Sequence, residues 1–124
     1  MLDAPKVQAM VGTAKAELAK VFYRDVLGLA LRSEDAFALI FDAGGQTLRI
    51  NRVPAVAPST YAILGFNVGD IVKSARALAA KGVVMERYSF FQQDADGIWS
   101  APDGTKVAWF RDPDANLLSI VQPK

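Results

Sequence analysis

The same order of strands and helix occurs twice along this chain of 124 residues. Alternating and helical spacing in the first half predicts a strand, a helix and three further strands, over 6–12, 13–28, 30–34, 36–42 and 46–52. The second half repeats this order, over 61–68, 70–82, 83–91, 105–111 and 116–122. Two βαβββ patterns in series favour an internal duplication and an α+β fold.

The two predicted helices carry recognisable faces and ends. In the first helix, Leu18, Phe22 and Val26 are four residues apart and predict one apolar face. In the second helix, Asp70 is placed to cap the start and Gly82 to end it. Both segments are therefore expected to pack one side against a sheet.

The length fits a single domain made of two modules. The modules are expected over about 1–52 and 60–124. The stretch between them, about 53–59, contains two prolines and has no periodicity, so it is interpreted as the linker.

The halves can be aligned without gaps around their last hairpins. Asp42 then matches Asp112, and residues 48–50 match 118–120. The alignment suggests that both aspartates lie in turns, where Asp side chains accept hydrogen bonds from backbone N–H groups. An alternative role for Asp42 is that of a general base.

Composition excludes several kinds of chemistry. The chain contains no histidine and no cysteine, which rules out histidine-dependent catalytic pairs, thiolate nucleophiles and disulfides. The formal net charge is +1, and no basic run predicts a nucleic-acid partner. No apolar run of membrane-spanning length and no secretory signal is visible, so no membrane association and a cytoplasmic location are expected.

Three segments resemble one known family in the order in which they occur. They are "VFYRDVLGL" at 21–29, "AAKGV" at 79–83 and "APDGTKVAWFRDPDANLLSIVQ" at 101–122. With these segments the chain resembles the vicinal oxygen chelate superfamily, which includes glyoxalase I, bleomycin-resistance proteins, fosfomycin-resistance enzymes and extradiol dioxygenases. One departure is Ala115, where the family usually has a glycine in the turn.

The resemblance implies that both modules form one cup-shaped mixed sheet, with helices on the convex face and the ligand in the cup. It also implies four metal-ligand positions, which match Gln8, Arg49, Ile63 and Ser119. Arg49 is a cation and Ile63 is apolar, whereas divalent cations need several oxygen or imidazole donors. We therefore expect neither a metal at this position nor another cofactor.

Arg49 is the first candidate for ligand binding. Strand alternation places it on the same face as Thr47 and Asn51, which the resemblance assigns to the cup. We expect a desolvated guanidinium near Gln8 and Ser119 that binds an anionic group. The alternatives are a structural arginine that pairs with an internal carboxylate or extends to water.

The second half is rich in aromatic residues, at Tyr88, Phe90, Phe91, Trp99 and Trp109. Trp109, which matches Leu39 of the first half, is expected to line the cup beside Tyr61 and Ile63. Trp99 lies in a loop-like segment, 94–104, that could act as a lid. Such residues either line a slot for a planar ligand or belong to the core or a dimer interface.

Two hypotheses from different classes follow. The first is a metal-independent small-molecule binding protein that holds an anionic or aromatic ligand without chemistry. The second is a glyoxalase-like lyase, isomerase or transferase without the usual metal, whose base would be Asp42, Glu86, Tyr61 or Tyr88. A homodimer is expected in both cases, from the resemblance and from the apolar surplus around 53–58 and 88–99.

Overall fold

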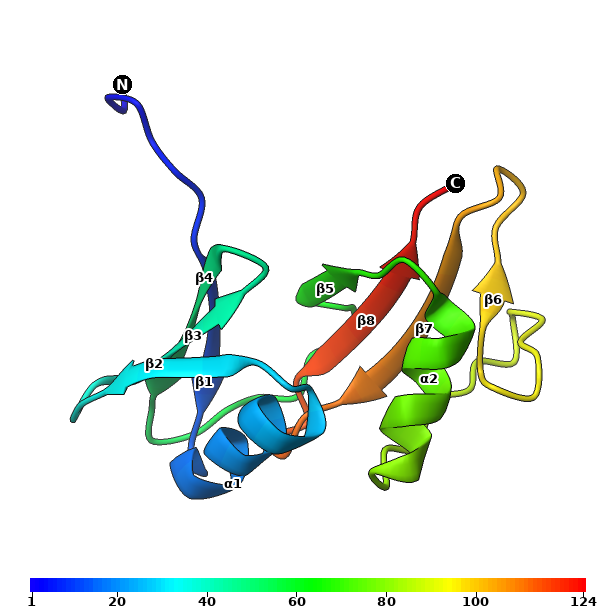
Figure 1. Cartoon of the computed structure of the whole chain (residues 1–124). Coiled ribbons are helices and arrows are strands. Elements are labelled where there is room, and N and C mark those ends of the chain that lie inside the picture. The colour runs from blue at the N-terminus through cyan, green and yellow to red at the C-terminus, as the bar shows by residue number, and fades with distance from the viewer. The chain divides into compact units, whose positions relative to one another are not determined.

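The computed structural model describes all residues from 1 to 124. The chain divides into two compact units, Met1–Val56 and Ala57–Lys124, which we refer to as the first and second modules. Each module contains its own four-stranded sheet and one helical segment (Figure 1). Fold class and the repeated βαβββ order are confirmed.

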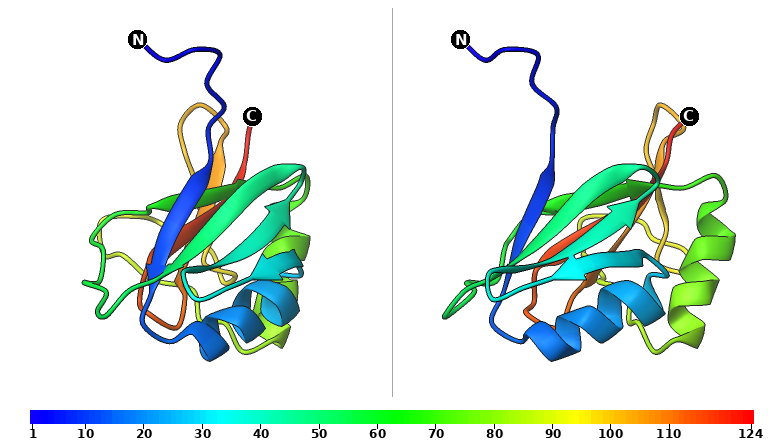
Figure 2. Two further views of the ribbon diagram at one scale, coloured as in Figure 1. Left: turned by 90° about the vertical axis from the view of Figure 1, so that its left-hand side faces the viewer. Right: turned by 60° about the vertical axis from the view of Figure 1, so that its left-hand side comes forward.

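The first module begins with a strand and ends with an antiparallel hairpin. Its elements are β1 (Ala9–Thr13), α1 (Ala16–Val21), η1 (Phe22–Val26), β2 (Ala30–Glu34), β3 (Ala38–Ala43) and β4 (Gln46–Arg52). The strands lie in the order β1-β4-β3-β2, and β1 is parallel to β4 (Figure 2). The sequence prediction of strands was correct to within a few residues, although Val7 and Gln8 precede β1 and are exposed.

Strand alternation in β4 separates the core from the open face of the sheet. Leu48 and Ile50 are fully buried, as predicted. Leu48 pairs with Phe41 of β3, whose ring contacts Tyr23 of η1 at a centroid distance of 5.9 Å. Arg49 therefore lies on the face of this sheet that the helix does not cover.

The helix of the first module differs from its predicted packing. The expected face of Leu18, Phe22 and Val26 is correct at Phe22, which is buried, but wrong at Leu18, which is exposed. The α-helix continues after Val21 as a π-turn, in which the Leu27 N–H donates to the Phe22 carbonyl at 2.9 Å. This wider turn lets the adjacent Phe22 and Tyr23 both enter the core, with Ala19 one turn earlier.

The second module repeats the arrangement. Its elements are β5 (Leu64–Asn67), α2 (Ile71–Ala80), β6 (Trp99–Ser100), β7 (Lys106–Arg111) and β8 (Leu117–Gln122). The strand order is β5-β8-β7-β6, with β5 parallel to β8. The predicted cap is present, since the Asp70 carboxylate accepts from the Lys73 N–H at 3.1 Å, and Gly82 takes the positive φ expected after the helix.

The predicted strand over 83–91 is wrong. Only the Glu86 N–H bonds to a strand, donating to the Trp109 carbonyl at 2.8 Å. The edge strand is instead β6, inside the segment that was expected to be a loop and a lid. The backbone at 86–88 bonds to the side chain of Gln93 in place of a further strand.

The two hairpins differ by one residue, which corrects the gap-free alignment. Asp42 lies within β3 and pairs with Thr47, so it is not a turn residue. Asp112 does lie in the turn, where its carboxylate accepts from the backbone N–H groups of Asp114 and Asn116. Ala115 in this turn has φ of 64°, so the alanine adopts the left-handed conformation that glycine usually supplies.

This extra residue changes which side chains of the first hairpin correspond to which side chains of the second. Arg49 faces Ile40 across its hairpin, whereas Ser119 faces Trp109. Trp109 therefore corresponds to Ile40 and not to Leu39, because a slip of one residue moves a side chain to the other face.

Neither α1 nor α2 has the length and apolar character of a membrane-spanning helix.

Candidate functional site

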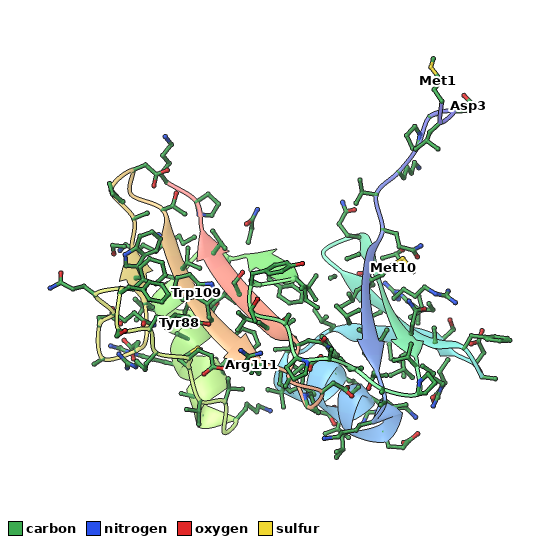
Figure 3. All side chains as sticks on the ribbon, turned by 180° about the vertical axis from the view of Figure 1, so that it is seen from behind. Met1, Asp3, Met10, Tyr88, Trp109 and Arg111 are labelled. Carbon is green, nitrogen blue, oxygen red and sulfur yellow. The ribbon has the colours of Figure 1, made fainter.

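The two faces of the second module's sheet have opposite character. Ala108, Phe110, Leu118 and Ile120 are buried on the face where α2 packs on β7 and β8. Trp109 lies between Ala108 and Phe110 in β7, so its indole projects from the opposite face (Figure 3). That face is not covered by a helix of its own module and is the candidate site.

Five aromatic rings gather on this face, and we refer to them as the aromatic cluster. They are Tyr88, Phe90, Phe91, Trp99 and Trp109. Four of them are half-buried, and Phe90 is 74% exposed. The cluster contains both tryptophans of the chain.

The rings pack in the geometries that aromatic pairs favour. Phe91 lies parallel to Trp109, with centroids 5.2 Å apart and an interplanar angle of 2°. Tyr88 meets Trp109 edge-on at 5.5 Å and 85°. Offset stacking and edge-to-face contacts each add about 0.5–1.5 kcal/mol beyond area burial, so the cluster is an ordered surface.

The side-chain amide of Gln93 connects two segments that carry this cluster, which we refer to as the 86–88 arm and the 97–99 arm. Its Oε1 accepts from the Tyr88 N–H at 2.8 Å. Its Nε2 donates to the carbonyls of Glu86 at 2.8 Å and Gly97 at 2.9 Å. Gln93 also forms an isolated antiparallel bridge with Trp99. The segment around Trp99 is therefore fixed to the 86–88 arm, contrary to the expectation of a lid.

An ion pair fixes the other end of the same arm. The Arg111 Nε donates to the Glu86 carboxylate at 2.5 Å, and both side chains are about one-third exposed. The second nitrogen of the guanidinium, Nη1, donates to the carbonyls of Ser59 and Ala115. Arg111 thus joins the 86–88 arm to the hairpin turn, and its charge is neutralised within the module.

The environment of Tyr88 keeps its phenol neutral. Partial burial raises the pKa of Tyr88 above its ordinary value of 10.0, and the nearby Glu86 carboxylate raises the pKa further. A neutral phenol can donate a hydrogen bond but is a poor base near neutral pH.

Other predicted site residues of the second module are less well placed. Ser119 is only 6% exposed, and a Cβ built on Gly65 would lie 3.1 Å from its hydroxyl oxygen, so the next strand covers it. Tyr61 and Ile63 precede β5 and are 72% and 39% exposed. Of the predicted residues here, Trp99 and Trp109 are brought together, at 6.1 Å between centroids.

In the first module, Arg49 lies half-buried on the open face of the sheet. Its Nε donates to the side-chain oxygen of Asn51 at 2.8 Å. No carboxylate lies within salt-bridge distance of it, although its charge contributes to lowering the pKa of Asp35, after hydrogen bonds from two backbone N–H groups. Gln8, predicted beside it, is exposed.

Arg49 is unusual among the arginines of this chain. The others are paired with carboxylates, except Arg87, which donates to the carbonyls of Asp94 and Ala95. A half-buried guanidinium with a neutral amide partner keeps donors for an anion. The expected internal pairing of Arg49 with Asp42 or Glu86 is absent.

The carboxylates considered as bases both lie near arginines. Asp42 is 3.5 Å from Arg32, and Glu86 is paired with Arg111. No group of three or more acidic side chains gathers in a way that could hold a metal ion.

Sequence reasoning identified the aromatic residues but missed Gln93, Arg111 and Ser59. Gln93 bonds to backbone groups four to seven residues away, and Arg111 and Ser59 bond to groups more than 50 residues away. Neither kind of bond leaves a periodic pattern. The β-branched and aromatic residues at 83–91 favoured a strand there, which hid the role of Gln93.

Comparison with known proteins agrees with this architecture. The model of the Glyoxalase/Bleomycin resistance protein/Dioxygenase superfamily matches residues 7–120. No curated protein matches the chain.

Several solved structures are similar over almost the whole chain. A lactoylglutathione lyase from Agrobacterium tumefaciens has 18% identity and a TM-score of 0.75, covering 98% of this chain and 95% of that one. A bleomycin-binding protein complexed with bleomycin has 20% identity and a TM-score of 0.75, covering 98% and 100%.

A bleomycin resistance determinant encoded on the transposon Tn5 has 20% identity and a TM-score of 0.76, covering 98% and 99%. At such identities the likeness concerns the fold. Because the family model spans most of the sequence, the chain belongs to the Glyoxalase/Bleomycin resistance protein/Dioxygenase superfamily.

Proposed function

We propose that this protein binds a small molecule with a planar aromatic part, which stacks on the aromatic cluster, and that binding requires no metal. The observation that carries the proposal is the position of Trp99 and Trp109 on the helix-free face of the second module's sheet. Large aromatic side chains that remain half-buried offer their ring faces to a ligand.

Charge around the cluster supports an apolar, planar ligand over a strongly charged one. The nearest ionic groups, Glu86 and Arg111, neutralise each other. Tyr88 supplies a neutral hydroxyl as the polar group of the cluster. Ligand sites commonly combine such an apolar wall with a few polar groups that fix orientation.

Relatives of the same fold support a binding role. One solved relative is a bleomycin-binding protein in complex with bleomycin, and another is a bleomycin resistance determinant. The extension to this chain is our proposal, since one fold hosts many functions.

Metal independence rests on the residues present at the four family positions. The first module supplies the exposed Gln8 and the cation Arg49, and the second module supplies the apolar Ile63 and the covered Ser119. A guanidinium about 4 Å from a metal cation repels it, and neutral hydroxyl and alkyl groups are poor ligands.

We also propose that Arg49 binds an anionic group in the first module. Its lack of a carboxylate partner and its half-buried place on the open face of the sheet support this role. A phosphate, sulfate or carboxylate would satisfy the remaining donors of the guanidinium.

A homodimer completes the proposal. Large apolar side chains are exposed in both modules, including Phe37 at 73% and Val84 at 84%. Burial of such residues against a second copy would remove apolar area from water, which favours association.

Tryptophan fluorescence offers a direct test of the proposed function, because both tryptophans lie in the cluster. Titration with 2-naphthol, a neutral bicyclic probe, should quench the emission saturably. Trp109→Ala should lower the affinity by about 5- to 150-fold, since stacking on an aromatic side chain contributes about 1–3 kcal/mol. Arg24→Ala, on the other module's surface, serves as the matched control.

Unchanged affinity in Trp109→Ala would overturn the aromatic site. Native mass spectrometry of the purified protein adds an independent measurement of a retained ligand. A retained compound without an aromatic part, unaffected by Trp109→Ala, would contradict the proposal as well. Turnover of a bound compound without added metal would instead favour the lyase or isomerase alternative.

A further inference from the structure

The ring of Phe91 covers both tryptophans of the cluster. Its centroid is 4.4 Å from that of Trp99 and 5.2 Å from that of Trp109, and the two indoles are 6.1 Å apart. The ring is tilted by 30° to one indole and by 2° to the other. A planar ligand that stacks on both indoles therefore has to occupy the volume in which Phe91 lies.

The walls around Phe91 are more firmly held than Phe91 itself. Tyr88 and Trp99 belong to arms that the Gln93 side chain ties together through three hydrogen bonds. Residues 89–92 form the tip between these anchors. Apart from ring contacts, Phe91 is held by one backbone bond, from its N–H to the Tyr88 carbonyl at 3.1 Å.

The tip also has room to move. Ser89, Phe90 and Gln92 on either side of Phe91 are exposed. A rotation of the tip that removes Phe91 from the indoles breaks none of the three bonds made by the Gln93 amide. The hydrogen bonds of Gln93 can therefore persist while the Phe91 ring moves away from the indoles. Such motion is expected for a segment with few anchoring contacts.

We propose that Phe91 is an internal occupant of the ring-binding position and lowers the affinity of every aromatic ligand that stacks there. This inference rests on the proposed function, because it concerns the same aromatic cluster. A ligand must replace the contacts that Phe91 makes with Trp99 and Trp109. A single six-membered ring replaces them without gain, whereas a fused bicyclic ring covers more of both indoles.

The expected gain in ligand affinity follows from the fraction of molecules in which Phe91 covers the indoles. When the binding-competent state is a fraction of all molecules, the apparent dissociation constant rises by the inverse of that fraction. If Phe91 covers the indoles in about nine molecules out of ten, its removal strengthens binding about tenfold. The wild-type protein should therefore bind both phenol and 2-naphthol about tenfold more weakly than a variant without the Phe91 ring.

The experiment measures phenol and 2-naphthol binding by isothermal titration calorimetry. Phe91→Ala should bind both phenol and 2-naphthol about tenfold more tightly than the wild type. Phe91→Leu removes the flat ring but keeps much of its volume, so its affinity should exceed that of the wild type but stay below that of Phe91→Ala. Phe91→Leu decides the question if Phe91→Ala fails to fold.

Phe90→Ala is the matched control. Phe90 is the next residue on the same tip, and its ring contacts Tyr88 and Phe91 but neither tryptophan. Its removal loosens the tip without uncovering the indoles, so phenol affinity should stay within about twofold of the wild type. An equal gain in Phe90→Ala would overturn the inference, because general loosening would then explain the effect.

The outcomes separate this inference from the proposed function. If neither Phe91 variant gains affinity for phenol, but Trp109→Ala loses affinity for 2-naphthol, the internal-occupant role is wrong and the aromatic site stands. If neither probe binds the wild type or any folded variant, both proposals are wrong. A gain confined to the Phe91 variants supports the inference.

Discussion

The Oε1 of Gln93 accepts a hydrogen bond from the backbone N–H of Tyr88 at 2.8 Å, five residues earlier in the chain. The same amide donates to Glu86 and Gly97. A side chain thus takes the place that a neighbouring strand would have had, and it positions the aromatic cluster.

Gln93→Leu should destabilise the protein by about 2–3 kcal/mol. The substitution leaves three backbone groups without their partners, and an unmet polar group costs about 1–3 kcal/mol where water cannot replace the bond fully. Urea denaturation followed by far-UV circular dichroism measures the change. Gln92→Leu, at the exposed neighbouring position, should change stability by no more than about 0.5 kcal/mol. Similar values for the two variants would contradict the bridging role.

Stability should fall in alkaline solution as Tyr88 ionises. Burial raises the pKa of this phenol in the folded state above 10.0, so the folded protein binds its proton more tightly than the unfolded chain. This contribution is fully present below about pH 10 and is lost as the pH rises through the raised folded pKa. Unfolding free energies from pH 8 to 11 test this, with Tyr88→Phe as the comparison. An identical alkaline decline in Tyr88→Phe would show that other groups cause it.

Arg49→Leu should abolish stabilisation by inorganic phosphate. A hydrogen bond to a charged group contributes about 1.5–3 kcal/mol, so the affinity for phosphate should fall by one to two orders of magnitude. The measurement is the melting temperature against phosphate concentration at constant ionic strength. Arg24→Leu, whose guanidinium is already paired with Asp25, should respond to phosphate as the wild type does. Equal responses in the two variants would refute the anion site.

Purified protein should carry no stoichiometric divalent metal, and a chelator should leave its melting temperature unchanged. Arg49 and Ile63 stand at positions where the family's metal ligands are expected, and neither donates to a metal. A metal bound to the folded state would stabilise it, so its removal would lower the melting temperature by several degrees. Elemental analysis that finds about one metal ion per chain would contradict this prediction.

The protein should sediment as a symmetric dimer at micromolar concentration. The expected interface buries more than about 1,000 Å² in total, as specific interfaces do. Analytical ultracentrifugation gives the mass of the assembly, for which one chain contributes 13.4 kDa. A single species at the monomer mass would refute the dimer.

Local pattern determined much of the first sheet and the second helix. Alternation along residues 46–52 placed Leu48 and Ile50 in the core and Arg49 on the opposite face, because side chains of a strand alternate whatever the strand pairs with. The Asp70 cap and the Gly82 end of α2 were predicted from the same kind of evidence. These features depend on residues within a few positions of one another.

Tertiary structure decided the features that the spacing of residues does not record. The π-turn after Val21 changed which residues of the first helix are buried, and one extra residue in the second hairpin placed Trp109 on the open face, unlike Leu39. The segment 83–98 had strand-like composition at its start, yet the Gln93 amide and the Arg111 guanidinium organise it instead. Periodicity records which face a side chain takes, whereas a hydrogen bond from a side chain such as Gln93 or Arg111 to a backbone group leaves no trace in the spacing of residues.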